Sequence, residues 1–277
     1  MKADSTPSPA DEPTLVVEKL DSMIHVLRLN RPSCLNAFTR EMVADFNRYL
    51  DTLATDAECR ALILTGSGRG FCSGQDVVAA DARNRTEPSG LTERIYWQEQ
   101  FAGMSERIRS LPQVVVAAVN GPCVGAGMAI ALASDVRIVA RSASFLIAAV
   151  RLGLTAGESG ISYFLPRLIG ASRAFEIMLS GRAIHAEEAD RIGLAVRLVD
   201  DADLLPAAEG WIREMLRSSP FSIAHTKRIM WANLDTSNFR AAIELENRSQ
   251  ILASMTEDYK EATAAFSEKR QPRYIGR

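Results

Sequence analysis

Two glycine-rich stretches of the sequence each follow a short apolar run, and these are the places where the backbone is most open to a ligand. Gly125-Ala-Gly127 follows Val114–Val119, and the stretch 66–74 follows Ala61–Thr65. Small residues at such a turn let a ligand approach the backbone closely. A bare helix start also presents free N–H groups and the positive end of the helix dipole. The helix start after Gly125-Ala-Gly127 therefore predicts backbone donors that hold an anion, including one that exists only during a reaction.

Other interpretations of these glycines stay open. Glycines also allow a helix to pack tightly on a sheet with no ligand present. A nucleotide site is disfavoured because Gly121-x-x-x-Gly125-x-Gly127 lacks the G-x-G-x-x-G order and no Gly-Lys-Ser/Thr follows it. The segment 70–74 does not give G-x-S-x-G, which argues against Ser73 as the nucleophile of a serine hydrolase.

One carboxylate stands out near these stretches. Glu158 lies in the small-residue loop 153–160, with Leu154, Ile161 and Phe164 as apolar neighbours in the sequence. A carboxyl group among apolar neighbours has a raised pKa, which suits a general acid or base. The alternative is an exposed loop glutamate or a helix N-terminal charge. The three histidines are far apart and give no metal-binding or triad spacing, so we expect no metal site.

Length and composition bound the remaining possibilities. The chain has 277 residues and 47% hydrophobic content, enough for one large domain with or without an appendage. Its formal net charge of -2 gives no general attraction to nucleic acid or to an anionic membrane. No apolar run is long enough to span a bilayer, and the four cysteines lack C-x-x-C spacing. We therefore expect a cytoplasmic protein with free thiols, whose residues 1–13 form a disordered tail.

Apolar patterning predicts an α/β body followed by helices. Alternating or continuous apolar runs predict strands at 15–17, 23–29, 61–65, 114–119, 136–139, 145–150 and 195–199. Apolar residues three or four apart predict helices at 42–53, 97–111, 128–133, 161–169, 174–179 and 186–192. Residues 77–91 are polar, so we expect a mobile loop there. Only helices are predicted from Leu204 onwards, which gives an α/β domain over 14–203 and a helical extension over 204–277.

Several segments, in order and at consistent spacing, resemble the enoyl-CoA hydratase/isomerase (crotonase) superfamily. They are LNRPSCLNAF at 29–38, ALILTGSGRGFCSGQD at 61–76, VAAVNGPCVGAGMAIALASDVRI at 116–138, LPRLIGASRAFEIMLSGR at 165–182 and AEEADRIGLAVRLV at 186–199. The resemblance covers residues 14 to 270. It implies a spiral of ββα units, a C-terminal helical trimerisation region, and trimers that commonly pair into hexamers. It also implies an acyl-CoA thioester substrate, so that coenzyme A enters with the substrate and no separate cofactor is expected.

The resemblance gives the two glycine stretches a chemical role. Removing a proton beside a thioester carbonyl, or adding water to its conjugated double bond, puts negative charge on the carbonyl oxygen. Two preorganised backbone N–H groups can hold that oxygen. Carried over by motif position, the donors are the N–H groups of Ser73 and Ala126. Ala126 stands where the family usually has glycine, but a backbone donor does not depend on its side chain.

The acidic residues depart from the family pattern. Hydratases of the family carry two glutamates, and the matching positions here are Ala129 and Ala149, neither of which can move a proton. Glu158 corresponds to the place where dienoyl-CoA isomerases and the 4-chlorobenzoyl-CoA dehalogenase carry a working aspartate. Glu158 is therefore the candidate general acid or base.

Binding coenzyme A requires cations for its phosphates and an apolar seat for its adenine. Each candidate side chain is also compatible with an ordinary surface role. The candidates are Arg31, Arg69, Lys227 and Lys269 for the phosphates, Ala37 and Phe266 for the adenine, and Gly74, Gln75 and Asp76 beside the first glycine stretch.

Four functions are compatible with this set of residues. The first is a 2-enoyl-CoA hydratase of fatty-acid metabolism, with Glu158 activating water or protonating the product. The second is an enoyl-CoA or dienoyl-CoA isomerase, which needs only one base. A thioester-binding or assembly protein with weak activity and a thioester hydrolase are the third and fourth. In each case we expect a homotrimer or a dimer of trimers that binds an acyl-CoA.

Overall fold

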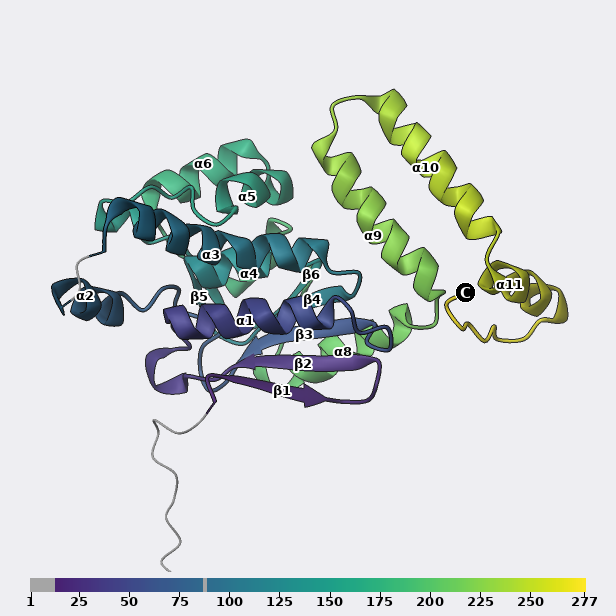
Figure 1. Ribbon diagram of the computed structural model, residues 1–277, viewed down its shortest axis with the longest axis horizontal. Helices are drawn as coiled ribbons and strands as arrows, with labels where there is room; N and C mark the ends of the chain where they lie inside the picture. The colour runs from purple at the N-terminus through teal and green to yellow at the C-terminus, as the bar shows by residue number, and fades with distance from the viewer. Residues whose placement is uncertain (1–12, 87–88) are drawn as a thin grey trace, which may run out of the picture.

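The computed structural model describes residues 13–86 and 89–277, so nearly all of the expected tail over 1–13 lies outside the described residues. Two sheets occur in this part of the chain: a six-stranded sheet in the order β1-β2-β3-β4-β6-β9 and a three-stranded sheet in the order β5-β7-β8 (Figure 1). The strands are β1 (Leu15–Lys19), β2 (Ile24–Leu29), β3 (Ala61–Gly66), β4 (Val114–Val119), β5 (Pro122–Val124), β6 (Val136–Ala140), β7 (Ser144–Leu146), β8 (Ile184–His185) and β9 (Arg197–Val199). The helices are α1 (Arg40–Leu53), α2 (Val77–Thr86), α3 (Leu91–Ser110), α4 (Ala126–Ala133), α5 (Ile161–Ile169), α6 (Ala171–Ser180), α7 (Ala186–Arg191), α8 (Leu204–Met215), α9 (Pro220–Asp235), α10 (Phe239–Ser254) and α11 (Glu257–Glu268).

The large sheet opens with the predicted hairpin and continues in parallel. β1 pairs antiparallel with β2, and Asp21 Oδ1 holds the turn by accepting the N–H groups of Met23 at 2.7 Å and Ile24 at 2.9 Å. β2, β3, β4, β6 and β9 then pair in parallel. Every residue of β3 and β4 is buried, as their continuous apolar runs predict for strands that are covered on both faces.

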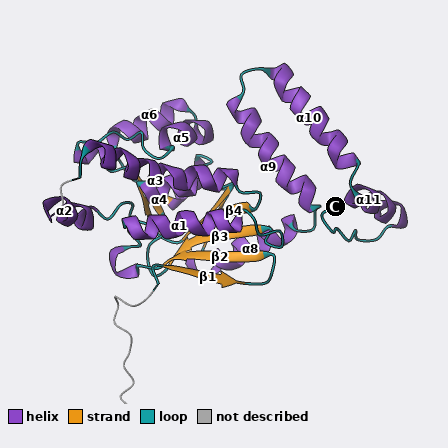
Figure 2. Ribbon diagram, viewed as in Figure 1, coloured by secondary structure: helices purple, strands orange, loops and turns teal. Residues whose placement is uncertain are grey.

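Alternate residues of these strands pack into two separate hydrophobic cores, one on each face of the sheet. Leu62 and Leu64 point to the face that packs with α1 and α3, whereas Ala61 and Ile63 point to the face that packs with α8. Figure 2 shows α1 lying along the orange strands β2 and β3, with α3 beyond it. Because α8 lies on the sheet, the part of the chain that extends away from the sheet begins with α9.

The prediction of a mobile loop over residues 77–91 is wrong for its first part, which forms the helix α2. The helix α3 already begins at Leu91. Asp76 Oδ1 accepts the N–H of Ala79 at 3.0 Å in the first turn of α2. Val77 and Val78 are 60% and 77% exposed, so α2 buries no apolar stripe. Helical spacing of apolar residues therefore could not reveal it.

The predicted strand over 145–150 is also corrected. β7 ends at Leu146, and Ala149–Leu152 form a short 3-10 helix. The short strands β5 and β8 were not predicted, because two or three residues are too few to show a period.

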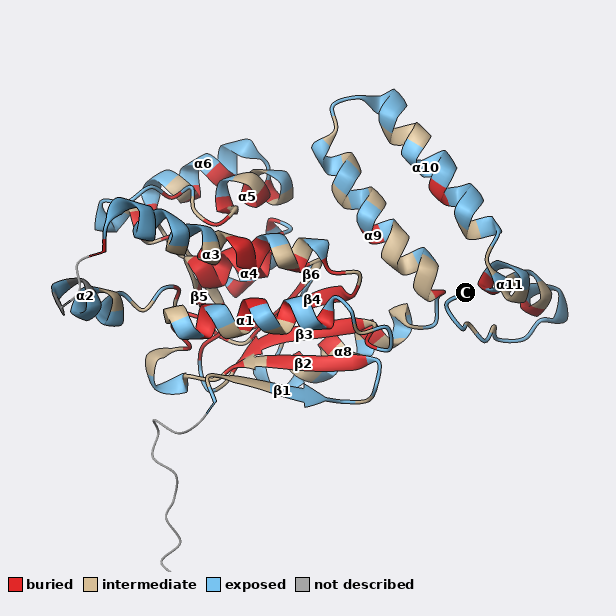
Figure 3. Cartoon of the chain, viewed as in Figure 1, coloured by how far each residue is buried: buried red, intermediate tan, exposed pale blue. Residues whose placement is uncertain are grey.

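Helices α9–α11 extend away from the sheet, as Figures 1 and 3 show. α9 and α10 each bury one residue, Lys227 and Ser249, and α11 buries Asp258 and Ala265. Many apolar side chains of this extension are exposed: Met230, Leu234, Phe239, Ile251, Leu252, Met255 and Phe266. In the described ranges no helix is long and apolar enough to cross a membrane.

A buried ion pair joins α9 to the sheet. Lys227 Nζ lies 2.7 Å from Asp135 Oδ2 and donates to Gln113 O at 2.8 Å. Trp231 Nε1 donates to Asp135 Oδ1 at 3.0 Å, and Val115 N–H donates to Asp135 Oδ2 at 2.8 Å. We call these contacts the α9 junction.

Candidate active site

The two glycine-rich stretches pack against each other beyond the C-terminal ends of β3 and β4, two central strands of the large sheet. Cys72 and Cys123 of β5, both free thiols, pair through their backbones in an isolated parallel β-bridge. Gly127 in the first turn of α4 lies against Cys72. A Cβ atom added to Gly127 would lie 2.5 Å from Cys72 O and 2.7 Å from Cys72 Cβ, far inside normal contact distance. Glycine is therefore required for α4 to begin this close to the first stretch.

Two asparagine side chains fix the backbone of the first stretch. Asn36 Nδ2 donates to three carbonyl oxygens of the segment 67–71, at 2.9, 2.8 and 3.2 Å. Asn120 Nδ2 donates to three carbonyl oxygens of the segment 66–70, at 3.0, 3.0 and 3.2 Å. Loop carbonyls that would otherwise need water are thereby satisfied, and the stretch keeps one shape.

The expectation that Ser73 supplies a free N–H group is corrected. Ser73 N–H donates to Leu35 O at 2.9 Å, and Ser73 Oγ donates to Cys34 O at 3.1 Å. The loop after β2 therefore uses both donors of this residue. Neither is open to a ligand.

The open N–H group in the first stretch belongs to Gln75. Phe38 pairs with Gln75 in a parallel bridge in which Phe38 N–H donates to Gly74 O at 2.8 Å and Asp76 N–H donates to Phe38 O at 2.9 Å. In such a bridge the N–H of the middle residue points away from the partner. Across residues 13–86 and 89–277, no protein atom accepts a hydrogen bond from Gln75 N–H. The candidate donor is therefore Gln75, two residues after Ser73.

Ala126 supplies the second open N–H group. It is the first residue of α4, so its N–H has no acceptor within the helix. Gly125 before it has φ 50° and ψ -118°, a conformation that favours glycine. A Cβ atom added to Gly74 would lie 3.6 Å from Ala126 N. The backbone just before Gln75 and the start of α4 are therefore in contact distance of one another.

Glu158 lies beside both turns. A Cβ atom added to Gly125 would lie 3.2 Å from Glu158 Oε1 and 4.0 Å from Gly74 Cα. The loop reaches this position through left-handed backbone at Ser159, with φ 48°, and Gly160, with φ 94°. The structure thus brings the predicted carboxylate to the start of α4.

Burial raises the pKa of the Glu158 carboxyl. Of its expected apolar neighbours, Ile161 and Phe164 are buried at the start of α5, whereas Leu154 is 66% exposed. A glutamate with a raised pKa exchanges protons closer to neutral pH than an ordinary one, which suits acid and base catalysis.

Asp76 is a carboxylate of the opposite kind. The N–H of Ala79 donates to it at 3.0 Å, and Arg31 Nη1 lies 3.0 Å from it. These hydrogen bonds, that of Ala79 first, lower the pKa of Asp76. Asp76 is therefore an ionised helix cap and not a proton carrier. Ala129 and Ala149 are both buried and carry no group that can move a proton.

Gly74, Gln75 and Asp76 lie in or directly after the first stretch, and three of the remaining six expected coenzyme A contacts lie close to it. Arg31 Nη1 donates to Ala37 O and pairs with Asp76, which follows Gln75. Ala37 is buried, and Arg69 is exposed within the glycine-rich stretch.

The other three expected contacts do not gather there. Lys227 is buried, and its ammonium group is used by the α9 junction, so its expected contact with a phosphate is corrected. Phe266 and Lys269 lie in and just after α11, at the far end of the molecule from α2 (Figure 1). Within one chain they are remote from Gln75 and Ala126.

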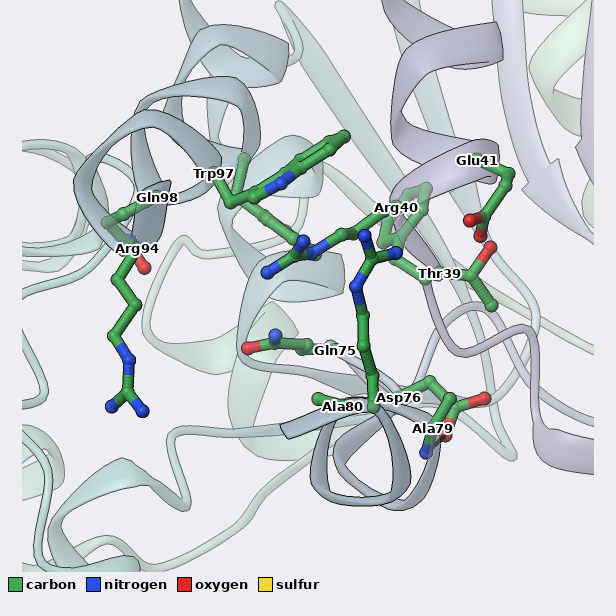
Figure 4. Close-up of a pocket in the computed structure, with 13 residues that line it drawn as sticks. Thr39, Arg40, Glu41, Gln75, Asp76, Ala79, Ala80, Arg94, Trp97 and Gln98 are labelled. Atoms are coloured by element: carbon green, nitrogen blue, oxygen red, sulfur yellow. Dashed lines mark hydrogen bonds between the residues drawn. The ribbon is translucent and has the colours of Figure 1, made fainter. Parts of the chain in front are cut away.

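A cavity of about 510 Å³ opens beside Gln75, between the starts of α1 and α2 and one face of α3 (Figure 4). This volume is typical of small-molecule sites. No sequence motif marks this cavity, because the aromatic residues of α3 there also fit a helix face that packs in the core. The lining includes Phe38, Thr39, Arg40, Gln75, Arg94, Trp97, Gln98 and Phe101.

Sequence comparison relates the chain to acyl-CoA enzymes. A family model described as enoyl-CoA hydratase/isomerase matches residues 19–277. The probable enoyl-CoA hydratase EchA12 of Mycobacterium tuberculosis is 40% identical over 263 residues, which cover 93% of this chain and 91% of that protein. The 1,2-epoxyphenylacetyl-CoA isomerase of Escherichia coli K12 is 35% identical over 264 residues, which cover 95% of this chain and 98% of that protein.

Solved structures agree with the predicted fold. The putative enoyl-CoA hydratase from Streptomyces coelicolor A3(2) superposes with a TM-score of 0.90 at 35% identity, covering 100% of this chain and 98% of that one. A monofunctional enoyl-CoA isomerase from M. smegmatis gives a TM-score of 0.71 at 38% identity, covering 83% of this chain and 98% of that one. The expected α/β spiral with C-terminal helices is thereby confirmed.

Proposed function

We propose that this chain, which belongs to the enoyl-CoA hydratase/isomerase (crotonase) family and acts on acyl-CoA, is an enoyl-CoA isomerase. One observation carries the choice of reaction. Glu158 has a raised pKa beside the two turns, while the neighbouring carboxylate of Asp76 is locked in an ion pair. Moving a double bond needs a single group that removes a proton and returns it elsewhere.

The proposed mechanism begins with the thioester oxygen between the N–H groups of Gln75 and Ala126. Glu158 removes a proton from the carbon next to the thioester of a 3-enoyl-CoA. The electrons of that C–H bond form a dienolate, whose negative charge lies largely on the oxygen held by the two N–H groups. Glu158 then returns the proton to the carbon at the far end of the original double bond, which gives the 2-enoyl-CoA. No water is consumed and no redox change occurs.

A 2-enoyl-CoA hydratase, the first of the functions expected from the sequence, is the second candidate. It is favoured by the relatives named probable enoyl-CoA hydratase at 40% identity, and by the partial exposure of Glu158, which leaves room for a water molecule. It is disfavoured by Ala129 and Ala149, because Glu158 alone would have to position water and transfer its proton.

Incubation with 3-enoyl-CoA and 2-enoyl-CoA substrates in water enriched in heavy oxygen separates the candidates. An isomerase converts the 3-enoyl to the 2-enoyl ester without taking up label. A hydratase places labelled oxygen on the β-carbon, and a hydrolase releases free coenzyme A with label in the acid. Tight binding with no conversion of either ester would support a thioester-binding protein and would contradict the proposal.

We further propose that α9–α11 mediate assembly into a homotrimer or a dimer of trimers. The exposed apolar side chains of this extension have no core of their own to join. Light scattering of the purified chain tests the proposal, since a monomer at micromolar concentration would contradict it.

A further inference from the structure

The cavity beside Gln75 combines aromatic rings with guanidinium groups from two elements. Trp97 and Phe101 of α3 line one wall, while Arg40 comes from the start of α1 and Arg94 from α3. Arg40 Cζ lies 4.6 Å from the centre of the Trp97 ring. In Figure 4, the side chains of Arg40 and Gln75 extend toward the side of the cavity where α3 carries Arg94 and Trp97.

The acidic residues of this cavity are already used within the fold. Asp76 pairs with Arg31 and caps α2. Glu41 lies at the start of α1, where hydrogen bonds from its own N–H and from Thr39 lower its pKa. The charge of Asp76 is thus directed at Arg31, and that of Glu41 at Thr39, Arg83 and Arg40 rather than at Arg94.

Arg94 lines the cavity from α3. Its Nε donates to Ser89 O at 3.1 Å. Within residues 13–86 and 89–277, no carboxylate lies at ion-pair distance from it, whereas Arg40 is held by Glu93 at 2.6 Å. The two terminal amino groups of Arg94 thus remain available for a planar anion, which a guanidinium binds with two parallel hydrogen bonds.

The backbone adds to the positive character. α1 begins at Arg40 and α2 begins at Val77, and the first turns of both helices line the cavity. The positive ends of two helix dipoles therefore point toward the space that the guanidinium groups border.

On the premise of the proposed function, we propose that this cavity receives the part of the acyl group farthest from the thioester and selects acyl groups that end in a carboxylate. Gln75 connects the two sites, since its N–H is a candidate for holding the thioester oxygen and its side chain lines the cavity. The carbon chain packs against Trp97 and Phe101, and its terminal carboxylate meets Arg94. The phosphates of coenzyme A are the other anionic groups of such a ligand. The test must therefore distinguish binding of the acyl carboxylate from binding of a phosphate.

Two esters that differ only at the acyl terminus provide the test: 3-hexenoyl-CoA and 3-hexenedioyl-CoA, which carries a terminal carboxylate. We expect kcat/KM for the second to exceed that for the first by about tenfold or more, the scale of a hydrogen bond to a charged group. Arg94→Gln should bring that ratio close to one. Arg94→Lys, which keeps the charge but not the two parallel N–H donors of a guanidinium, should retain part of it. Arg48→Gln, on the exposed face of α1, is the matched control and should keep the full ratio.

Binding measurements with hexanoyl-CoA, hexanedioyl-CoA and free coenzyme A distinguish this inference from the proposed reaction. If neither 3-enoyl ester isomerises but hexanedioyl-CoA still binds about tenfold more tightly than hexanoyl-CoA, and Arg94→Gln abolishes the difference, the cavity is assigned correctly and the reaction is not. If both 3-enoyl esters isomerise at equal kcat/KM, the reaction stands and this inference is overturned. If Arg94→Gln weakens free coenzyme A as much as hexanedioyl-CoA, the arginine holds a phosphate and the inference is likewise overturned.

Discussion

The Glu158 loop shields a charged group from water in part and the α9 junction does so almost fully, but only the junction supplies that group with partners. At the junction, Lys227 lies 2.7 Å from Asp135 and also donates to two carbonyl oxygens. In the described part of the chain, no side chain donates a hydrogen bond to the carboxylate of Glu158, and burial raises its pKa. A buried charge that is fully paired supports structure, whereas one left open is available for proton transfer.

Lys227 also shows why a shifted pKa alone does not identify a catalytic group. Burial lowers the pKa of Lys227 even though Asp135 opposes the shift. The neighbours separate the two residues. Lys227 is surrounded by hydrogen-bond and ion-pair partners, whereas Glu158 lies beside open backbone amides. Four predictions test this comparison.

The largest expected effect is on turnover in Glu158→Gln. The variant keeps the volume of the side chain but cannot accept a proton, so we expect kcat/KM for isomerisation to fall by about 10²–10⁴-fold. Its melting temperature at pH 7 should equal or exceed that of the wild type, because a desolvated charge is removed. Steady-state kinetics and calorimetry on the same preparation check both halves. Unchanged turnover would remove Glu158 from the mechanism.

The next effect concerns the N–H of Ala126. Proline is tolerated at the first position of a helix, so Ala126→Pro removes this donor while α4 still forms. We expect kcat to fall by about 10²–10³-fold, as for the loss of one donor from other oxyanion sites. Ala126→Gly keeps the donor and is the control. Equal activity of the two variants, with circular dichroism showing both folded, would argue against the amide pair.

At the α9 junction the effect should be on stability. Lys227→Met leaves Asp135 buried without its cation, so we expect a loss of about 3–5 kcal/mol in the free energy of unfolding. In the double variant Asp135→Asn with Lys227→Met neither charge of the pair remains, and most of the loss should be recovered. Urea titrations measure all three proteins. Wild-type kcat in the folded Lys227→Met variant is expected, and a loss of catalysis without a loss of stability would place Lys227 in the site.

The smallest effect is a shift with pH. Glu158 must be ionised to act as a base, so kcat/KM should decline as pH falls through its raised pKa, starting at a higher pH than for an ordinary glutamate. Stability should change in the matching sense. A raised pKa in the folded state means that the wild type loses stability relative to Glu158→Gln as pH rises through that pKa. Melting temperatures of both proteins, measured from about pH 4, where carboxyl groups usually titrate, to about pH 8, check the sign. A difference in melting temperature between Glu158→Gln and the wild type that narrows with rising pH would contradict it.

The sequence predicted the parts of the fold in which burial leaves a local pattern. β3 and β4 are continuous apolar runs because both faces of the sheet are covered, and Thr39 does cap α1. The helix α2 was missed because it buries no apolar stripe. Local pattern thus reports on packing against a core and not on helices that lie on the surface.

The site was predictable only where the sequence neighbours decide the chemistry. The N–H of Ala126 is open because it starts a helix, and this follows from the glycines around it. The choice between Ser73 and Gln75 depends instead on pairing with Phe38 and Leu35, more than thirty residues earlier in the chain. Lys227 looked like a free cation because its partner, Asp135, is also distant in the sequence. Contacts of this kind become visible only in three dimensions.

The hydrogen bonds that Asn120 makes to the first glycine-rich stretch also affect the chemical degradation of the protein over time. An asparagine followed by glycine, as in Asn120-Gly121, loses ammonia readily in a flexible chain when the glycine nitrogen attacks the side-chain amide carbon. Here the amide group is held by three carbonyl oxygens and by Gly66 N–H, and these hydrogen bonds oppose the side-chain rotation that the attack requires. Once the chain unfolds, that protection ends, and an aspartate or isoaspartate formed at position 120 has no amide hydrogens left to donate. Deamidation during a brief unfolding event would therefore make the loss of this loop permanent.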